Sequence, residues 1–260
     1  MSESGHPAGQ AYNRRLLLGE KRNVVLTLRE VQQYGRDSFG DPDHVSIYGL
    51  SPREWYARGV RILGRTAVEC TRDRLAGQIG RDVAAVARAA PAAPPVVVDL
   101  FAGSANTLRW IKQHTGARRG IGFELDDGVY GLTRANLSVM DLDIELVHDS
   151  YERGLRALTE PDEDLLIVFV APPWGRALSE GSGLDLRRTQ PPVAEAVDVT
   201  TGLLGQHRLL FAIQVWETVE PGSLADLTAR FPWSAVKLYD LNAPGQNAGL
   251  LLATWGWAPA

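Results

Sequence analysis

The segment VVVDLFAGSANT, residues 96–107, decides the fold of this chain. Its first residues are continuously apolar rather than alternating, which is typical of a parallel strand buried on both faces of a sheet. The small residues that follow make a tight turn, which opens a helix through TLRWIKQH. Small side chains let the backbone approach a ligand, and the first N–H groups of a helix await an acceptor. The segment predicts a strand, a turn and a helix, and the turn is either a ligand site or an ordinary connection.

Apolar runs of the same kind recur toward the C-terminus, with intervals long enough for crossover helices. They are GIGFEL (120–125), IELVHD (144–149), LLIVFVAPP (165–173) and RLLFAIQVW (208–216). The last two runs, SAVKLYDL (234–241) and GLLLATWGW (249–257), are separated by a short turn-forming segment, so they predict an antiparallel hairpin. We therefore predict an α/β fold with a doubly wound, mostly parallel, seven-stranded sheet and a C-terminal hairpin.

The N-terminal part of the chain has a different pattern. The segment AAPAAPP, 89–95, interrupts any helix and marks a border. The charges also divide there, with 14 basic and 10 acidic residues up to residue 90 and 13 basic and 21 acidic residues after it. Ser51 and Thr71 are candidate N-caps of helices over 51–63 and 71–90, whereas residues 36–50 look like a loop. We predict a disordered lead (1–15), a helical N-terminal extension or lid (16–92) and a catalytic domain (93–260).

Composition limits the classes of function. The net charge of −4 disfavours a non-specific nucleic-acid binder, and no apolar run approaches the ~20 residues of a membrane helix. The single cysteine, Cys70, forms no internal disulfide and no cysteine-based zinc site, so we expect no metal. The N-terminus has neither a basic nor an apolar signal region, so we expect a cytoplasmic protein without a membrane partner.

Acidic residues follow three consecutive predicted strands. The first strand contains Asp99, Glu124 lies 21 residues after Gly103, and Asp149 ends the third strand. An acid about 20 residues after a glycine turn is placed to accept hydrogen bonds from ribose hydroxyls, and Asp149 is placed to accept an adenine amino proton. Glu124 and Asp149 are also suited to cap a helix. Because ligands bind beyond the carboxyl ends of such strands, the three endings together favour a nucleoside site.

The fourth strand ends in Ala171, Pro172, Pro173, Trp174 and Gly175. Consecutive prolines fix a rigid corner, and the indole that follows on the ligand side offers a stacking platform for a planar molecule. The alternative is that Trp174 lies in the core or at its rim.

These motifs, in this order, resemble those of class I S-adenosylmethionine-dependent methyltransferases, and most of all the group of trimethylguanosine synthase and guanine-N2 methyltransferases. The resemblance covers residues 46–257 and implies a Rossmann-like fold with S-adenosylmethionine as cofactor. It implies that Pro172, Pro173 and Trp174 form the catalytic acceptor-side motif. It also implies a cofactor-binding set made of Asp99, Phe101, Gly103, Asn106, Thr107, Glu124 and Asp149.

The chain departs from that group at two positions. Ala105 replaces the second glycine of a loop that is one residue shorter, which affects the seat of the methionine carboxylate. Ala171 replaces the Asp, Asn or Ser that opens the fourth motif in amino-methylating relatives, and its side chain accepts no hydrogen bond. Backbone carbonyls of Ala171 and Pro172 can still hold an exocyclic amine, because a neutral nitrogen needs no strong base.

We therefore predict methyl transfer to a planar acceptor, a nitrogen of a heteroaromatic small molecule or nucleobase stacked on Trp174. Tyr48, Ala171, Arg187 and Arg188 are candidates for acceptor binding, although 24 of the 27 basic residues are arginine, which weakens the case for any one arginine. An oxygen or carbon acceptor would need a base. The candidates for that base are His44, Tyr48 and His148.

Three other interpretations stay open at the level of sequence. An RNA methyltransferase acting on cap or ribosomal guanine is the first alternative, and the acidic C-terminal part makes a small acceptor the preferred partner. A nucleoside-binding protein without transfer activity is the second. A nicotinamide-dependent dehydrogenase is disfavoured, because residues 96–107 lack the three-glycine spacing of a pyrophosphate site.

Overall fold

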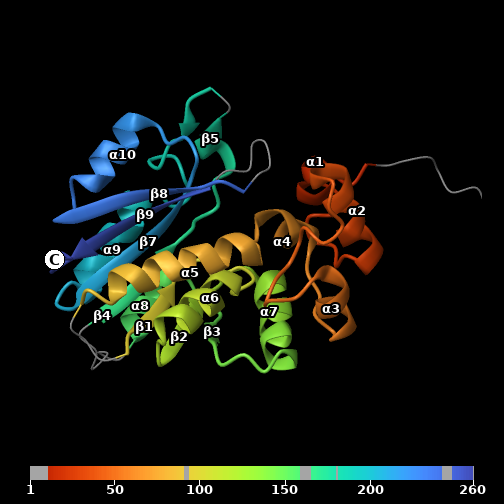
Figure 1. The fold of residues 1–260 in the computed structure, drawn as a ribbon, viewed down its shortest axis with the longest axis horizontal. Coiled ribbons are helices and arrows are strands. Elements are labelled where there is room, and N and C mark those ends of the chain that lie inside the picture. The colour runs from red at the N-terminus through yellow and green to blue at the C-terminus, as the bar shows by residue number, and fades with distance from the viewer. Residues whose placement is uncertain (1–10, 91–93, 159–164, 180, 242–247, 260) are drawn as a thin grey trace, which may run out of the picture.

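The computed structural model describes residues 11–90, 94–158, 165–179, 181–241 and 248–259. Its α-helices are α1 (Arg14–Leu18), α2 (Leu28–Phe39), α3 (Pro52–Ala57), α4 (Gly64–Glu69), α5 (Asp73–Ala87), α6 (Asn106–Thr115), α7 (Asp127–Val139), α8 (Tyr151–Ala157), α9 (Val193–Leu204) and α10 (Pro221–Thr228), with a 3₁₀ turn η1 (Gly175–Ala177). Its strands are β1 (Val96–Asp99), β2 (Arg119–Phe123), β3 (Glu145–Val147), β4 (Leu165–Val170), β5 (Leu178–Ser179), β6 (Gly183–Leu184), β7 (Arg208–Trp216), β8 (Trp233–Tyr239) and β9 (Ala248–Trp255). Figure 1 shows their arrangement.

Seven strands form one sheet in the order β3-β2-β1-β4-β7-β9-β8. The first five are parallel, whereas β9 pairs antiparallel with both β7 and β8. This arrangement confirms the predicted doubly wound sheet and its C-terminal hairpin. The strand order reverses beside β1, and this is the position where doubly wound sheets bind ligands.

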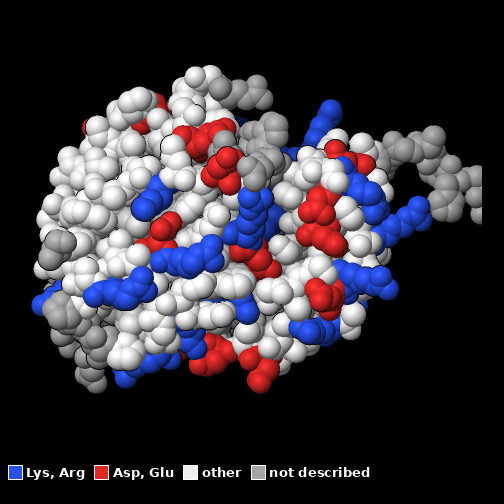
Figure 2. Space-filling model, viewed as in Figure 1, with Lys and Arg blue, Asp and Glu red and all other residues white. Residues whose placement is uncertain are grey.

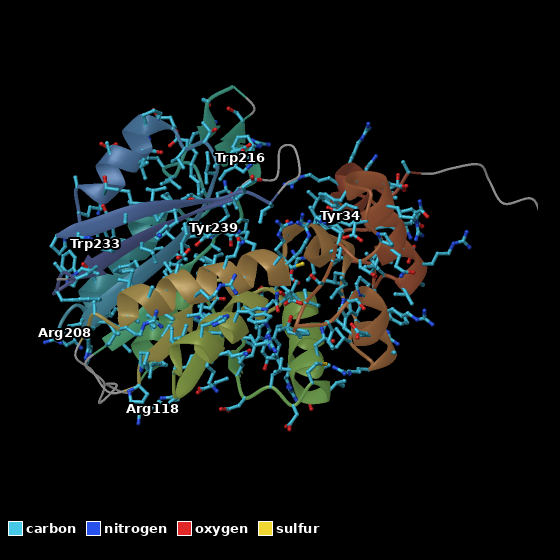
Figure 3. All side chains as sticks on the ribbon, viewed as in Figure 1. Tyr34, Arg118, Arg208, Trp216, Trp233 and Tyr239 are labelled. Atoms are coloured by element: carbon cyan, nitrogen blue, oxygen red, sulfur yellow. The ribbon has the colours of Figure 1, made fainter. Side chains whose placement is uncertain are left out.

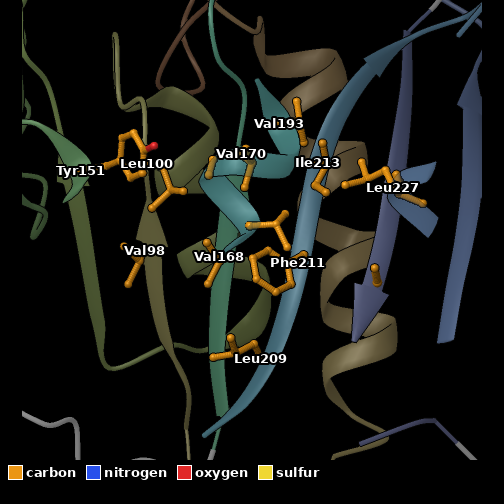
Figure 4. Packing of buried hydrophobic residues seen from close by; sticks show 14 of the residues in the cluster. Val98, Leu100, Tyr151, Val168, Val170, Val193, Leu209, Phe211, Ile213 and Leu227 are labelled. Carbon is orange, nitrogen blue, oxygen red and sulfur yellow. The ribbon is translucent and has the colours of Figure 1, made fainter. Parts of the chain in front are cut away.

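Burial explains why the central strands have no alternating pattern. Every residue of β1 and β4 is buried, because helices cover both faces of the sheet there. Helices α5 and α6 cover the face seen in front in Figure 1, and α8, α9 and α10 pack on the other. On the second face, Val168 of β4 and Phe211 of β7 share a core cluster with Leu227 of α10 (Figure 4). The edge strand β3 has no fully buried residue.

Helices α1–α4 form a compact N-terminal module with its own core, which contains Leu17, Val31, Trp55 and Val60. Helix α5, in contrast, belongs to the sheet, because Leu75, Ile79 and Val83 share a core cluster with the central strands. By packing, the border between module and sheet therefore lies next to residue 72. The composition border at 89–95 instead follows a helix of the sheet domain.

The N-terminal module is fixed to the sheet domain by hydrogen bonds, two of them part-buried and one exposed. The backbone N–H of Arg61 donates to Asn136 Oδ1 at 2.9 Å, and Asn136 Nδ2 donates back to the Arg61 carbonyl at 2.8 Å. The Gly49 N–H donates to Asp73 Oδ2 at 2.8 Å. These contacts hold the module against α7 and the start of α5. Whether any of it acts as a lid stays a prediction.

Several local expectations differ from the structure. Helix α2 extends to Phe39, inside the expected loop of 36–50, and helix α3 ends at Ala57, well before residue 63. Ser51 caps α3 as expected, whereas Arg72, and not Thr71, occupies the N-cap position of α5. The Thr71 hydroxyl donates to Gln214 Oε1 at 2.8 Å instead.

At the N-terminus, helix α1 begins at Arg14, inside the expected lead of 1–15, because Asn13 Oδ1 accepts the Leu16 N–H. Residues 1–10 and most of the expected hairpin turn, 242–247, lie outside the described residues. Within the described ranges, no helix is long and apolar enough to cross a membrane, and no group of His, Cys, Asp and Glu side chains is arranged to hold a metal ion.

Candidate cofactor and acceptor site

Asp99 ends β1 as a buried carboxyl group. Its side chain is 1% exposed, and its Oδ1 accepts the backbone N–H of Phe101 at 3.0 Å. Burial, with a smaller contribution from the nearby Glu124 charge, raises the pKa of Asp99 to about 7, against the lowering effect of the Phe101 hydrogen bond. A buried carboxyl group with so raised a pKa favours a cationic partner, and such groups are typical of functional sites.

Glu124 joins the ends of β1 and β2. Its Oε2 accepts the backbone N–H of Gly103 at 3.0 Å, and its Oε1 accepts that of Asp126 at 2.8 Å. Burial raises the pKa of Glu124. Gly103 has φ +51°, and a Cβ built there would meet no atom nearer than the Phe101 carbonyl oxygen at 4.0 Å. The side-chain position of Gly103 therefore faces open space, and the Glu124 carboxylate holds the turn at this point. That Glu124 binds a ribose stays a prediction.

Leu125 is a candidate site residue that the sequence interpretation missed. This large apolar side chain is 65% exposed and directly follows Glu124. Among the described large apolar side chains, it is as exposed as any. An exposed leucine beside a partly buried carboxylate is suited to cover the apolar face of a ligand. Its place after the acid that ends β2 was a sequence signal that could have identified it.

The turn between β1 and α6 is fixed from outside by the N-terminal module. Asn106 Oδ1 accepts the Tyr48 backbone N–H at 2.8 Å, and Asn106 Nδ2 donates to the Thr71 carbonyl at 2.9 Å. The buried Tyr48 hydroxyl donates to the Ser104 carbonyl at 2.6 Å, and burial raises its pKa. Tyr48 was expected at the acceptor and Asn106 at the cofactor. In the structure the two residues are hydrogen-bonded to each other, and together they fix the turn.

The shortened turn requires an uncommon backbone conformation. Ala105 precedes α6 with φ +55°, in the left-handed region that glycine favours. Ala105 and Thr107 are both buried. The replacement of a family glycine by alanine therefore leaves the turn in a glycine-like conformation, and its methyl group lies inside the protein.

The end of β3 presents polar groups that are engaged with neighbours. Asp149 Oδ1 accepts Arg153 Nε at 2.6 Å and the Ser150 N–H at 2.7 Å, and the Arg153 hydrogen bond lowers the pKa of Asp149. His148 stacks on Tyr130 with ring centroids 4.4 Å apart. This environment keeps Asp149 ionised and leaves its second carboxylate oxygen as an acceptor.

Phe101 and Tyr151 meet between the ends of β1 and β3. Their ring centroids are 5.3 Å apart at an angle of 57°, and Tyr151 is 4% exposed whereas Phe101 is half-buried. The Tyr151 hydroxyl is buried, and it has no hydrogen-bond partner among the described residues. Phe101 is half-buried and lies between the end of β1 at Asp99 and Gly103, and its place in the cofactor set stays a prediction.

The end of β4 forms the opposite side of the site. Pro172 is buried and Pro173 exposed, and Trp174 is half-buried because it packs against the core cluster beneath α8 and α9. Ala171 is also half-buried. The sequence offers two interpretations of Trp174, an exposed platform and a rim residue. The structure places it between the two, with one part in the core and another part accessible.

Arg187 and Arg188 differ in their surroundings. Arg187 contacts three acids, with Asp185 at 2.9 Å, Glu220 at 2.7 Å and Asp226 at 3.6 Å. Its charge is thus balanced within the protein, which leaves it poorly suited to clamp an acceptor phosphate or carboxylate. Arg188 is exposed and forms no ion pair with the residues that the structure describes. Of the two arginines, only Arg188 has a positive charge that no described acid balances.

The three candidate bases are unequal. His44 stacks on Phe39 with ring centroids 3.5 Å apart, and burial, aided by the Arg72 charge, lowers its pKa to about 3. The His44 imidazole is therefore neutral near pH 7. So low a pKa also makes it too weak a base to take a proton from an acceptor. The Tyr48 hydroxyl donates a hydrogen bond to the Ser104 carbonyl. His148 Nε2 lies 3.1 Å from Asp127 Oδ1. His44 and Tyr48 are therefore poorly suited to act as bases, and His148 stays a candidate.

Comparisons with known proteins identify the fold. No family model and no curated protein sequence matches the chain. Among solved structures, a METTL16 methyltransferase domain matches with TM-score 0.53 and 14% identity, over 72% of this chain and 84% of that chain. A human methyltransferase 10 domain containing protein matches with TM-score 0.51 and 14% identity, over the same two shares. The chain therefore has the α/β fold of class I methyltransferase domains.

Proposed function

We propose that this chain is an S-adenosylmethionine-dependent methyltransferase that modifies a nitrogen of a planar acceptor, a heteroaromatic small molecule or a nucleobase. The observation that carries the proposal is the Glu124 carboxylate, which holds the turn at Gly103, and the side-chain position of that glycine faces open space. The methyltransferase fold of the structural neighbours supports it.

The residues at the strand ends fit this cofactor chemically. Asp99 and Glu124 both have pKa values raised by burial, so a cationic ligand would stabilise their ionised forms. S-adenosylmethionine, when bound, supplies an electrophilic methyl group on a positively charged sulfur. In this proposal Glu124 accepts hydrogen bonds from the ribose hydroxyls, and Asp149 accepts one from the adenine amino group. Phe101 and Leu125 cover the apolar faces of the ligand, and Asp99 and the Gly103 turn hold its amino-acid end.

On the acceptor side, the chain positions the acceptor without acting on its protons. Pro172 and Pro173 fix the backbone after β4, and the accessible part of Trp174 stacks on the acceptor ring. The carbonyls of Ala171 and Pro172 accept the hydrogens of an exocyclic amine, so that its lone pair faces the methyl group. Holding two reacting groups in line can supply an effective molarity on the order of 10⁵ M or more. Tyr48 has a positioning role, because its hydroxyl holds Ser104.

An RNA acceptor is the second candidate, and one surface favours it. Arg74, Arg81 and Arg88 are exposed and recur every seven residues, so they line one face of α5 over about 21 Å. Figure 2 shows basic side chains along the front of the molecule where α5 runs, with acids interspersed. None of the three forms an ion pair with a described acid. Asp82 beside them is engaged by the Tyr239 hydroxyl of β8 at 2.8 Å (Figure 3).

Methyl transfer from isotope-labelled S-adenosylmethionine tests the proposal. The chain is incubated with a metabolite extract and, separately, with an RNA fraction, and labelled products are identified by mass spectrometry. A labelled heteroaromatic nitrogen in either fraction supports it. Tight binding of S-adenosylhomocysteine without transfer to either fraction would instead favour a nucleoside-binding protein that has lost the reaction.

A further inference from the structure

A groove separate from the candidate cofactor site lies between α6 and the segment that leads into β3. It is lined on one side by residues that share a face of α6, and on the other by residues that precede β3. These are Arg109, Lys112 and Gln113, and Leu142, Asp143 and Ile144. Lys112 also packs beside Gly120, at the start of β2. This α6 groove therefore adjoins the amino ends of β2 and β3, whereas the cofactor candidates lie at the carboxyl ends (Figure 1).

The α6 groove combines positive charge with apolar walls. Lys112 Nζ donates to the Asp143 carbonyl at 2.7 Å and to Asp143 Oδ2 at 2.6 Å. Asp143 is the one acid among the described lining residues, and its side chain is 94% exposed, so it lies at the rim. Leu142 packs against the core of the N-terminal module and Ile144 against that of the sheet, and both are half-buried. The groove thus offers two cationic side chains, one acid and an apolar surface.

Arg109 is a half-buried cation without a counter-ion. No described acid lies within ion-pair distance of its guanidinium group. Its Nη1 is enclosed and unpartnered, whereas its Nε and Nη2 donate to no described residue and are not enclosed. Burial lowers the pKa of Arg109, against the raising effect of the Asp73 charge, so the surroundings disfavour the charged form. The half-buried Arg61, in contrast, donates to the Tyr56 and Val60 carbonyls. A bound anion would supply the partner that Arg109 lacks.

The guanidinium group of Arg109 is held in place by its neighbours. Its Cζ lies 4.5 Å from the centroid of the Trp110 ring. A Cβ built at Gly49, in a turn of the N-terminal module, would lie 3.5 Å from Arg109 Nη2. Asp73 accepts Trp110 Nε1 at 2.7 Å and the Gly49 N–H at 2.8 Å, so both of its oxygens are engaged. Trp110 and Gly49 therefore position the guanidinium group, and no described acid neutralises its charge.

Gln113 provides a second donor. Its side chain is exposed, one turn of α6 after Arg109, and its amide forms no hydrogen bond with a described residue. Residues four apart lie on the same face of a helix, with about 5–6 Å between their Cβ atoms. An arginine and an amide placed in this way can hold the two oxygens of one carboxylate.

We propose that the α6 groove binds a small organic anion, a monocarboxylate with a short apolar tail. Arg109 and Gln113 hold the carboxylate, and the tail lies against Leu142 and Ile144. The volume of the groove, about 260 Å³, is just below the ~300–1,000 Å³ typical of ligand pockets, so the ligand is small. A nucleic-acid strand fits less well, because it has no apolar tail and Asp143 at the rim would repel it. The anion binds apart from the cofactor, whether or not the chain is a methyltransferase.

Hexanoate is the probe, titrated into the full chain while the methyl signal of Ile144 is followed by NMR. This signal is identified by its absence from Ile144→Val. We expect a saturable shift, an affinity about 10-fold lower for hexanol, which lacks the charge, and a similar loss in Arg109→Gln. Arg134→Gln removes an exposed arginine of α7, outside the groove, and should leave the affinity unchanged. Gln113→Glu adds an acid at an exposed position and should weaken hexanoate binding by about 10-fold or more.

Absence of a saturable shift, equal affinities for hexanoate and hexanol, or an equal loss in Arg134→Gln would overturn the proposal. Displacement of hexanoate by a short single-stranded RNA would overturn it too, because the groove would then be a nucleic-acid contact. Gln113→Glu keeps the test valid if Arg109→Gln unfolds, since the Gln113 amide has no described partner to lose. Binding of S-adenosylhomocysteine to the unmodified chain tests the proposed function separately.

Discussion

Glu124 accepts the backbone N–H of Gly103 at 3.0 Å, across 21 positions of sequence. The bond closes the turn after β1 onto the end of β2, and both residues belong to the predicted ribose site. The carboxylate that binds the ligand in our proposal is therefore also the one that shapes the turn.

Replacement of Glu124 by Gln should weaken S-adenosylhomocysteine binding by about 10- to 100-fold, because the ribose loses a charged acceptor and the Gly103 turn loses its fixed partner. Calorimetric titration gives the affinity. Asp127→Asn is the matched control, since that side chain is 95% exposed and lies only three residues away. An unchanged affinity in Glu124→Gln, or an equal loss in Asp127→Asn, would contradict the assigned role.

Asp99 should make cofactor binding depend on pH. Its pKa of about 7 means that the free protein is protonated there below neutrality, whereas the ammonium group of the ligand's amino-acid end, which S-adenosylhomocysteine also carries, prefers the carboxylate. Affinity for S-adenosylhomocysteine should therefore fall as pH decreases through about 7, approaching tenfold per pH unit. Titrations between about pH 5.5 and about pH 7.5 test this, and Asp99→Asn should be weaker and nearly independent of pH. A flat profile for the unmodified chain would refute it.

The same group should act on stability in the opposite direction. Between its unfolded pKa near 4 and its folded pKa of about 7, Asp99 binds more protons in the native state than in the unfolded chain. The free energy of unfolding of the ligand-free protein should therefore fall as pH rises across this range. Asp99→Asn should remove this decrease in the free energy of unfolding. Near pH 8 the variant should therefore be more stable than the unmodified chain. Denaturant unfolding at several pH values measures it, and an Asn variant that is less stable at every pH would contradict burial as the cause.

Trp174→Ala should leave S-adenosylhomocysteine affinity nearly unchanged and reduce methyl transfer by about 10- to 100-fold, the range expected for loss of a stacking platform. Trp174→Phe keeps an aromatic ring and should retain part of the activity. Because Trp174 also packs against the core, cofactor affinity reports whether the variant is folded. Full activity in the alanine variant would exclude the stacking role.

Tyr48→Phe separates a positioning role from an acceptor-binding one. Loss of the 2.6 Å bond to the Ser104 carbonyl should cost about 1 to 2 kcal/mol of stability and weaken cofactor binding, with the acceptor KM unchanged. Unfolding and steady-state kinetics measure the two effects. Tyr56→Phe is the control, since its hydroxyl has no hydrogen bond with a described residue. A raised acceptor KM with unchanged stability would restore the role predicted from the sequence.

The arginines of α5 decide between the two acceptor classes. If RNA is the acceptor, replacing Arg74, Arg81 and Arg88 by Gln should weaken RNA binding and lower the slope of log affinity against log salt by about 0.7 for each phosphate that is no longer neutralised. Replacing Arg29, Arg36 and Arg58, exposed arginines of the N-terminal module, should not. Equal slopes for all three proteins would leave the small acceptor as the better proposal.

The sheet was predictable because its strands are marked by local composition. The runs that contain Val96–Asp99 and Leu165–Val170 are buried on both faces, so each carries its own signal. Helix α2 also has a local signal, since Thr27 and Glu30 form a reciprocal capping box that the sequence spells out three residues apart. Its C-terminal turn overlaps a polar segment rich in turn formers, and this segment favoured a loop from residue 36 onward.

Candidate site residues could be chosen from the sequence only where the choice depends on a place at a strand end, as for Glu124 and Gly103, and their roles stay predictions. The role of Asn106 depends on Tyr48, 58 residues away, and that of Arg187 on Glu220, 33 residues away. Tertiary packing brings such partners together, and no local pattern of the sequence predicts them.

A crystal structure of the chain with S-adenosylhomocysteine tests the central claim most directly. The account predicts the ligand at the carboxyl ends of β1, β2 and β3, with its ribose hydroxyls on Glu124, its amino-acid end at Asp99 and the Gly103 turn, and its sulfur toward Trp174. Density for the ligand elsewhere, or its absence at saturating concentration, would contradict the account.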